Sequence, residues 1–180
     1  MSIAIRVVDE FDDERFKELV KRNLEDATGF IPAWEYFTDG DQSFSSEGEK
    51  IRIGAFEQET LIGLSWGQAT KSHRFMMHMS LVEAEYRGQG VYRAMLELML
   101  EKTRKYDSVD SWHHILNNRV IATKLRYGFN IVGFDQSIII GPRINMRFFN
   151  NDKLYELMKF RTGLVKMPEF HCSEGDKNEC

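Results

Sequence analysis

A short glycine turn between two segments of different periodicity constrains the fold of this chain more than any other feature. The turn is Arg87–Gly90, with the sequence RGQG. The segment before it, Arg74–Val82, has the pattern of a strand, and Val91–Arg104 after it carries apolar residues at helical spacing. A further strand is expected at Val109–Leu116. This order predicts a strand–helix–strand crossover of an α/β fold.

The remaining segments extend the crossover into a single mixed, mostly antiparallel sheet of the α/β (α+β) class. Gln58 and Glu59 form a two-residue link between two alternating segments, which predicts a hairpin. The other expected strands are Ile3–Val8, Lys50–Glu57, Thr60–Thr70, Asn130–Ile140 and Ile144–Phe149, with Gly141 and Pro142 between the last two. The other expected helices run from a cap at Asp12 to a break at Gly29, over Phe30–Phe37, over Asn117–Tyr127, and over Asp152–Phe160 with Asp152 as its cap.

The strand before the turn is expected to alternate without interruption, because successive side chains of a strand point to opposite faces. On this basis one face carries Met76, His78, Ser80 and Val82. The opposite face carries Met77, Met79 and Leu81.

The length of 180 residues suits one domain. We expect this domain to span residues 1–163 and a polar tail to span residues 164–180. The two cysteines, Cys172 and Cys180, lie in the tail and form neither a CxxC pair nor a set of zinc ligands. Cysteines so placed are typical of a reduced cytoplasmic protein.

Composition argues against two classes of partner. The net charge of −4 disfavours nucleic acid, because proteins that bind it are usually strongly basic. The chain has no run of about 18 apolar residues, so no membrane span is expected. Acidic residues begin at Asp9, which is untypical of a signal peptide. We therefore expect a cytoplasmic protein without nucleic-acid or membrane partners.

The glycine turn has the chemistry of a phosphate site. Glycines allow a tight turn and a close approach of the backbone to a ligand, and the first turn of a helix offers unpaired N–H groups to an anion. A dinucleotide fingerprint would need a third glycine, where the chain has Arg93, and a P-loop would need Gly-Lys-Ser/Thr. Acyl-coenzyme A is the remaining ligand class. A helix start that binds nothing is the alternative.

The chain resembles the GCN5-related N-acetyltransferases over roughly residues 3–149. That family carries Arg/Gln-x-x-Gly-x-Gly/Ala between a strand and a helix, and Arg87–Tyr92 (RGQGVY) matches it except for Tyr92 in the last place. A second match is Asn117, followed by a short helix and then Gly128-Phe129. The resemblance implies acetyl-CoA as co-substrate and no metal. The residues that it implies for acetyl-CoA are Leu81, Val82, Arg87, Gly88, Gln89, Gly90, Val91, Tyr92, Asn117 and Lys124.

The resemblance further implies direct attack of an amine on the thioester carbonyl, polarised by backbone N–H groups near Leu81 and Val82. The amine must lose a proton to a base or to water, and the departing thiolate must gain one. The candidate bases are His78, Glu83, and one of His113 and His114. The candidate acids are Tyr127, Lys124, which occupies the place of a tyrosine in many members, and water. Packing of His78 in the core and solvation of Glu83 at a turn are the alternatives.

The acceptor is expected to be a primary amine of a small molecule or of a protein. The resemblance implies that the early helices line its pocket, where an amine would suit Glu35 and the neighbouring aromatic rings. The segment concerned carries Trp34, Glu35, Tyr36, Phe37 and Asp39. Phe30, Trp34 and Phe37 also have the spacing of core residues on a helix. Pairing of Ile144–Phe149 across a two-fold axis would give a homodimer.

Two classes of function therefore follow from the sequence. The first is an acetyl-CoA-dependent N-acetyltransferase. The alternative is a non-catalytic acyl-CoA-binding sensor or partner-binding module on the same fold, because a fold does not determine a function. Convergence of a base and an acid on the thioester would distinguish the enzyme from the sensor.

Overall fold

The computed structural model describes residues 2–28, 48–137 and 141–166. The chain divides into a compact unit, Met1–Asn150, and a second unit, Asn151–Cys180. The expected helix at Phe30–Phe37 and both cysteines lie outside the described residues. The expected domain boundary after residue 163 stays a prediction.

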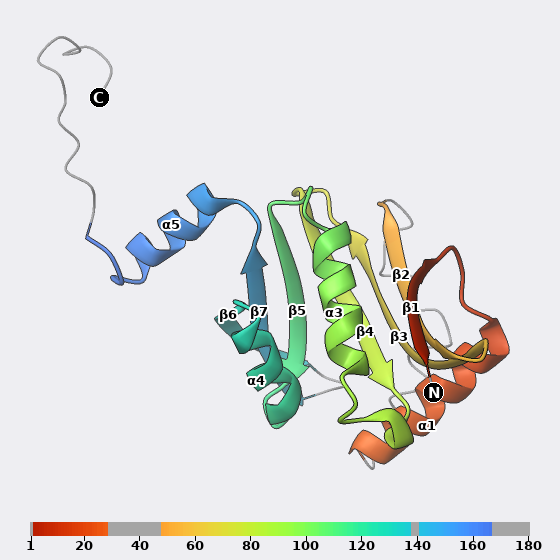
Figure 1. Ribbon diagram of the computed structural model, residues 1–180. Coiled ribbons are helices and arrows are strands. Elements are labelled where there is room, and N and C mark those ends of the chain that lie inside the picture. The colour runs from red at the N-terminus through yellow and green to blue at the C-terminus, as the bar shows by residue number, and fades with distance from the viewer. Residues whose placement is uncertain (1, 29–47, 138–140, 167–180) are drawn as a thin grey trace, which may run out of the picture. The chain divides into compact units, whose positions relative to one another are not determined.

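The first unit is built on one mixed sheet, which confirms the predicted fold class (Figure 1). The strand order among the described residues is β1-β2-β3-β4-β5-β7-β6. The pair β4 and β5 is parallel, and every other neighbouring pair is antiparallel. The strands are β1 (Ile3–Val8), β2 (Lys50–Glu57), β3 (Thr60–Ala69), β4 (Arg74–Val82), β5 (Ser108–His114), β6 (Asn130–Ser137) and β7 (Gly141–Phe149).

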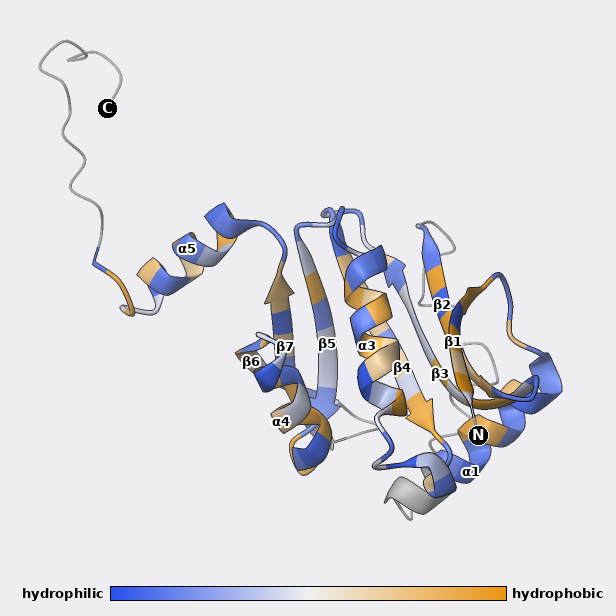
Figure 2. Cartoon of the chain, in the orientation of Figure 1, coloured by the Kyte–Doolittle hydropathy of each residue, from blue (hydrophilic) through white to orange (hydrophobic). Residues whose placement is uncertain are grey.

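Helices cover both faces of this sheet. The crossover helix α3 (Val91–Lys102) joins β4 to β5, and α4 (Asn118–Arg126) follows β5. Both helices contribute to the larger core cluster, in which Phe75, Val109 and Met146 are fully buried. On the other face, α1 (Asp13–Thr28) buries Leu19 against β3. Apolar residues that alternate along the strands thus form one core on each face of the sheet. The C-terminal end of β4 is hydrophobic (Figure 2).

Strand β4 contains a bulge that the sequence did not predict. Trp66 pairs with Met79 and Gly67 pairs with Met77, so His78 is an extra residue in β4. A bulge of this kind shifts the alternation of the strand beyond it. Val82 therefore packs with Met77 in the larger cluster. The prediction that Met76, His78, Ser80 and Val82 share one face is therefore wrong. Likewise, Met79 and Leu81 do not share a face with Met77 but pack on the α1 side.

The end of the sheet also differs from expectation. Gly141 and Pro142 do not end a strand but begin β7, where Pro142 is paired with Gln136 of β6. Strand β7 lies between β5 and β6, so both of its edges are occupied. Pairing of Ile144–Phe149 with a second copy is therefore excluded as a route to a homodimer. The homodimer itself stays a prediction.

The second unit contributes one described helix, α5 (Asp152–Arg161). Its N-cap is Asn151, whose side chain accepts hydrogen bonds from the backbone N–H groups of Lys153 and Leu154. The expected cap at Asp152 is thus one residue too late, and Asp152 lies in the first helical turn instead. No helix within the described ranges is long and apolar enough to cross a membrane.

Candidate functional site

The turn between β4 and α3 is shaped by two glycines in the left-handed conformation. Gly88 has φ +83° and Gly90, the N-cap of α3, has φ +88°. Other residues adopt such angles at a cost, because a Cβ atom collides with the backbone there. A Cβ atom placed on Gly88 would meet nothing within 4 Å. The surface in front of this turn is therefore open to a ligand.

The N-terminus of α3 presents backbone donors at the turn. The first helical hydrogen bond runs from the N–H of Ala94 to the carbonyl of Gly90, 3.0 Å away. Within the described ranges, no acceptor contacts the N–H groups of residues 88–93. Unpaired N–H groups and the positive end of the helix dipole attract an anion. The turn has the donors and the space that a diphosphate needs.

Beside this turn, the two parallel strands of the crossover separate (Figure 1). Their pairing begins at Arg74 and Ser108 and ends at Met77 and Ser111. Beyond that point β4 continues to Val82 and β5 continues to His114. We call this opening, between residues 78–82 of β4 and residues 112–114 of β5, the fork. The edge of β4 that faces the fork makes no ladder hydrogen bonds with β5.

Lys124 of α4 lies at the apex of the fork. Its Nζ atom is 2.7 Å from Oγ of Ser111 and 3.5 Å from Sδ of Met77, the last pair before the strands separate. The ammonium also lies 4.7 Å from the ring centre of Phe129. Lys124 is 1% exposed, and burial lowers the pKa of its amine to about 7. No carboxylate among the described residues pairs with it.

His113 continues the polar contacts that begin at Lys124. Its Nε2 atom is 3.1 Å from Oγ of Ser111, so the hydroxyl lies between an ammonium and an imidazole. Burial and the neighbouring charge of Lys124 lower the pKa of His113 to about 3. Ser111 was not anticipated, although its place two residues before His113 on one strand face was a usable signal.

His78 lies on the other side of the fork. It directly follows Met77, the last residue of β4 that pairs with β5, and its ring contacts the Trp66 ring with centroids 4.6 Å apart. Burial, and to a lesser extent the charge of Lys50, lower the pKa of His78 to about 4. The imidazole is therefore neutral at pH 7. His78 and Lys124 place two titratable groups on opposite faces of the same opening.

A cavity of about 340 Å³ lies beside the fork, on the sheet face away from α3. Met76, Ser111 and Trp112 line it next to the fork. Asp110 also lines it, bound through both oxygens by Arg147 at 2.7 and 2.8 Å. The cavity therefore adjoins the apex of the fork at Ser111.

Comparison with known proteins identifies the fold. Neither protein-family models nor curated sequences match the chain, but solved structures do. The chain resembles a probable acetyltransferase from Staphylococcus epidermidis with a TM-score of 0.67 and 13% identity over 82% of this chain and 99% of the other. It resembles the ribosomal-protein-S18-alanine N-acetyltransferase of Escherichia coli with a TM-score of 0.66 and 16% identity over 83% and 95%.

A third similar structure is the PaiA N-acetyltransferase of Thermoplasma acidophilum in complex with coenzyme A. Its TM-score is 0.66, with 18% identity over 83% of this chain and 99% of the other. The chain has the GCN5-related N-acetyltransferase fold. In this fold the glycine turn and the fork lie at the crossover that the sequence predicted.

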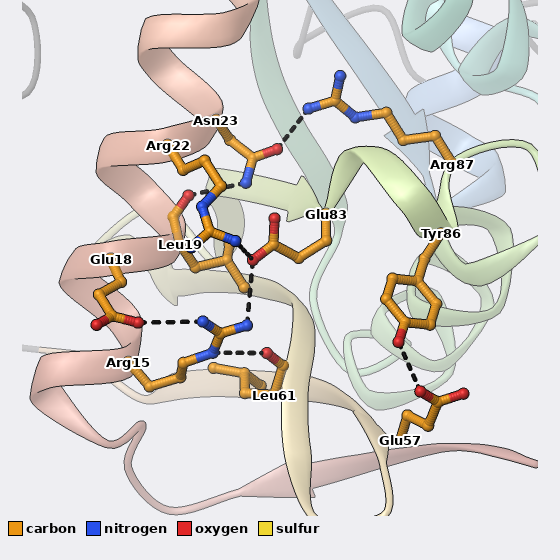
Figure 3. Close-up of polar contacts among 10 residues, drawn as sticks. All are labelled: Arg15, Glu18, Leu19, Arg22, Asn23, Glu57, Leu61, Glu83, Tyr86 and Arg87. Atoms are coloured by element: carbon orange, nitrogen blue, oxygen red, sulfur yellow. Dashed lines mark hydrogen bonds and ion pairs between the residues drawn. The ribbon is translucent and has the colours of Figure 1, made fainter.

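In this acetyltransferase fold, Arg87 and Glu83 join the turn to α1 (Figure 3). The Arg87 guanidinium donates to the carbonyl of Val82 at 3.0 Å and to Oδ1 of Asn23 on α1. Glu83 is 6% exposed, and its Oε1 atom accepts hydrogen bonds from the guanidinium groups of Arg15 at 3.1 Å and Arg22 at 3.3 Å. The solvated turn acid considered for Glu83 is therefore wrong. Both side chains are engaged in holding α1.

The side chains of the other residues predicted to bind acetyl-CoA around the turn are engaged within the protein. The Gln89 amide donates to the carbonyl of Glu85 at 2.9 Å. Val91 packs in the larger core cluster, as does Val82, and Leu81 packs on the α1 side. The Tyr92 ring packs inward, where its hydroxyl is buried without a partner among the described residues. Tyr92 therefore does not crowd the turn, and burial raises the pKa of its hydroxyl.

Three other predicted residues lie away from the apex of the fork. Tyr127 follows α4 and donates to Glu97 of α3, a hydrogen bond that raises the pKa of the Tyr127 hydroxyl. Asn117 is exposed at the start of α4, and its side chain does not cap that helix. His114 accepts the N–H of Leu116 through Nδ1 at 3.2 Å. The acceptor residues predicted at positions 34–39 lie outside the described residues. Within those described, no cluster of side chains suits a metal ion.

Proposed function

We propose that this protein is an N-acetyltransferase that transfers an acetyl group from acetyl-CoA to a primary amine. The observation that carries the proposal is the combination of a phosphate-binding turn at Gly88 and Gly90 with an open fork beside it. The turn suits the diphosphate of coenzyme A because it offers free N–H groups and open space. The resemblance of the sequence to the acetyltransferases supports the same ligand.

In the proposed reaction, the amine nitrogen attacks the thioester carbonyl, so a C–N bond forms and the C–S bond breaks. The ammonium form of the acceptor loses two protons in all, of which one ends on the thiol and one in solvent. Negative charge develops on the carbonyl oxygen, and N–H groups on the open edge of β4 would stabilise it. Removal of one such donor costs about 3–4 kcal/mol in enzymes where it has been tested.

We assign the first proton transfer to His78. Its imidazole is neutral at pH 7, because burial lowers its pKa to about 4, so it has a lone pair to accept a proton. Because this pKa lies well below the working pH, the imidazole would act as a relay to water rather than as the final proton acceptor. Glu83 is a poorer candidate, because its carboxylate is already bound by Arg15 and Arg22.

The acceptor is proposed to be a small-molecule or protein amine that reaches the fork through the cavity lined by Met76 and Trp112. Ser111, which lies at the apex of the fork, also lines this cavity, so the amine would reach the thioester there. A primary amine of either source has the required nucleophile.

The test is release of free thiol from acetyl-CoA by the purified full chain over a panel of amines, with the acetylated product identified by mass. The panel includes polyamines, amino acids and peptides with free N-termini. Thiol release with an acetylated amine supports the proposal. Tight binding of acetyl-CoA without thiol release for any amine overturns it in favour of the non-catalytic acyl-CoA-binding module.

A further inference from the structure

Resting on the proposed acetyl transfer, we propose that Lys124 donates the proton to the departing thiolate of coenzyme A and regains it through Ser111 and His113. The sequence left this acid open among Tyr127, Lys124 and water. The contacts at the apex of the fork favour Lys124.

The position of Lys124 suits a donor to the departing thiolate. Nζ of Lys124 contacts Met77 at 3.5 Å and Ser111 at 2.7 Å, and these two residues are the last pair of β4 and β5. The ammonium thus lies where the sheet begins to open. A thioester that enters the fork from the turn at Gly88 would be directed toward this point, because the opening between the strands ends there. Tyr127 instead donates to Glu97 on α3.

Burial of an ammonium at this position is costly. A lysine at a protein surface normally extends its ammonium into water, but Lys124 is 1% exposed. Its partners are a hydroxyl, a thioether and the face of Phe129, none of which neutralises a charge. Nothing in the fold requires an ammonium at this position, since a methionine would fill a similar volume. The charge is therefore explained best by a role in the reaction.

Ser111 and His113 offer a path for the returning proton. A hydroxyl both donates and accepts, so Ser111 can connect Lys124 with His113. After the C–S bond breaks, the electron pair stays on sulfur, which takes a proton from Nζ. The neutral amine then receives the Ser111 proton, Ser111 receives one from Nε2 of His113, and solvent returns one to Nδ1.

The acidity of the donor agrees with this role. Burial brings the pKa of Lys124 to about 7, near the value of about 8.5 for an ordinary thiol. Proton transfer is efficient between groups of similar pKa near the working pH. From β5, His113 is the titratable group that faces Lys124. The contacts recorded for Lys124 from β4 and from Phe129 involve no titratable side chain.

The experiment compares kcat as a function of pH for the wild type, Lys124→Met and Lys124→Gln. For the wild type we expect kcat to fall at alkaline pH with an apparent pKa near 7, because a neutral lysine has no proton to give. Both variants should lose 10²- to 10⁴-fold in kcat and should lose the alkaline limb, with unchanged affinity for acetyl-CoA. Ser111→Ala should lower kcat with the same unchanged affinity.

Lys102→Met is the matched control, because Lys102 is exposed and pairs with Glu101. It should keep the wild-type profile. Wild-type kcat and pH dependence in Lys124→Met overturn the inference, as does a comparable loss in Tyr127→Phe instead. Stoichiometric acetylation of Lys124 also overturns it, since the amine would then be a nucleophile. Each of these outcomes requires an active wild type, whereas failure of the proposed function is an inactive wild type.

Discussion

At the scale of single residues, Lys124 affects both the proposed reaction and the stability of the fold. Its amine has a pKa of about 7 in the fold because of burial, against about 10.4 in an unfolded chain. Between these values the unfolded state binds more protons than the folded state, so the free energy of unfolding rises with pH. Below pH 7 the lysine is charged in both states, and burial of this charge lowers the free energy of unfolding by on the order of 4 kcal/mol.

Replacing Lys124 by methionine should therefore stabilise the protein at pH 6, by up to about 4 kcal/mol. The gain should shrink as the pH rises from 7 to 10. Urea unfolding of the wild type and of Lys124→Met at pH 6, 8 and 10 measures the difference. A variant that is less stable than the wild type at pH 6 would contradict the burial of an unneutralised ammonium.

His78 permits a second prediction at this scale. His78→Asn should lower kcat about 10²-fold or more without weakening the binding of acetyl-CoA. The substitution removes the proton acceptor but leaves the glycine turn intact. His73→Asn is the matched control, since His73 is exposed and pairs with Asp107. Steady-state kinetics with calorimetric binding separates the two effects. Full activity of His78→Asn would remove His78 from the mechanism.

Individual residues also mark what the sequence could not predict. The place of Lys124 before Gly128-Phe129 was visible through the resemblance to the acetyltransferases. Its contacts with Ser111 and Met77 were not, because they depend on how α4 packs against two strands. Contacts of this kind are tertiary, and local pattern carries no information on them.

At the scale of elements, side chains of α1 contact the segment that follows β4 (Figure 3). Glu83 receives Arg15 and Arg22, and Arg87 donates to Asn23. The sequence suggested catalytic or phosphate-binding roles for Glu83 and Arg87. The structure directs both side chains to α1, so we interpret them as positioning residues for the turn.

Glu83→Gln should lower the free energy of unfolding by about 1–3 kcal/mol, because the substitution removes a buried carboxylate that binds both Arg15 and Arg22. Glu18→Gln should change it by less than about 0.5 kcal/mol, since Glu18 pairs with Arg15 at the surface. Urea denaturation measures both variants. Equal effects would show that the pair at Glu83 does not fasten α1.

The glycine turn gives a further prediction. Gly88→Trp should weaken acetyl-CoA binding at least tenfold, because its side chain enters the open space where the diphosphate is proposed to bind. Gly163→Trp is the control, since Gly163 also has a positive φ, +73°, and open space for a Cβ atom. Calorimetric titration compares the two. Equal affinity would place the diphosphate elsewhere.

The bulge in β4 shows why element boundaries were easier to predict than faces. The alternation of Arg74–Val82 is regular in sequence, and the strand has the predicted bounds. The bulge at His78 comes from the register with β3, in which Trp66 and Gly67 face Met79 and Met77. Register is a property of two strands, so one strand's sequence did not disclose it.

At the scale of the whole molecule, the α/β class, the hairpin and the crossover followed from local pattern and from the resemblance. The insertion of β7 between β5 and β6 did not, because strand order is set by contacts between distant segments. The insertion bears on assembly, since it removes the free edge that a dimer through Ile144–Phe149 would need.

In the first unit, the turn at Gly88 and the fork are together proposed to bind acetyl-CoA. Calorimetric titration of the full chain with acetyl-CoA is the first experiment to make. We expect one site per chain with micromolar affinity, and weaker binding as salt screens the diphosphate. No heat of binding up to millimolar acetyl-CoA would contradict it, and the turn would then be a helix start without a ligand.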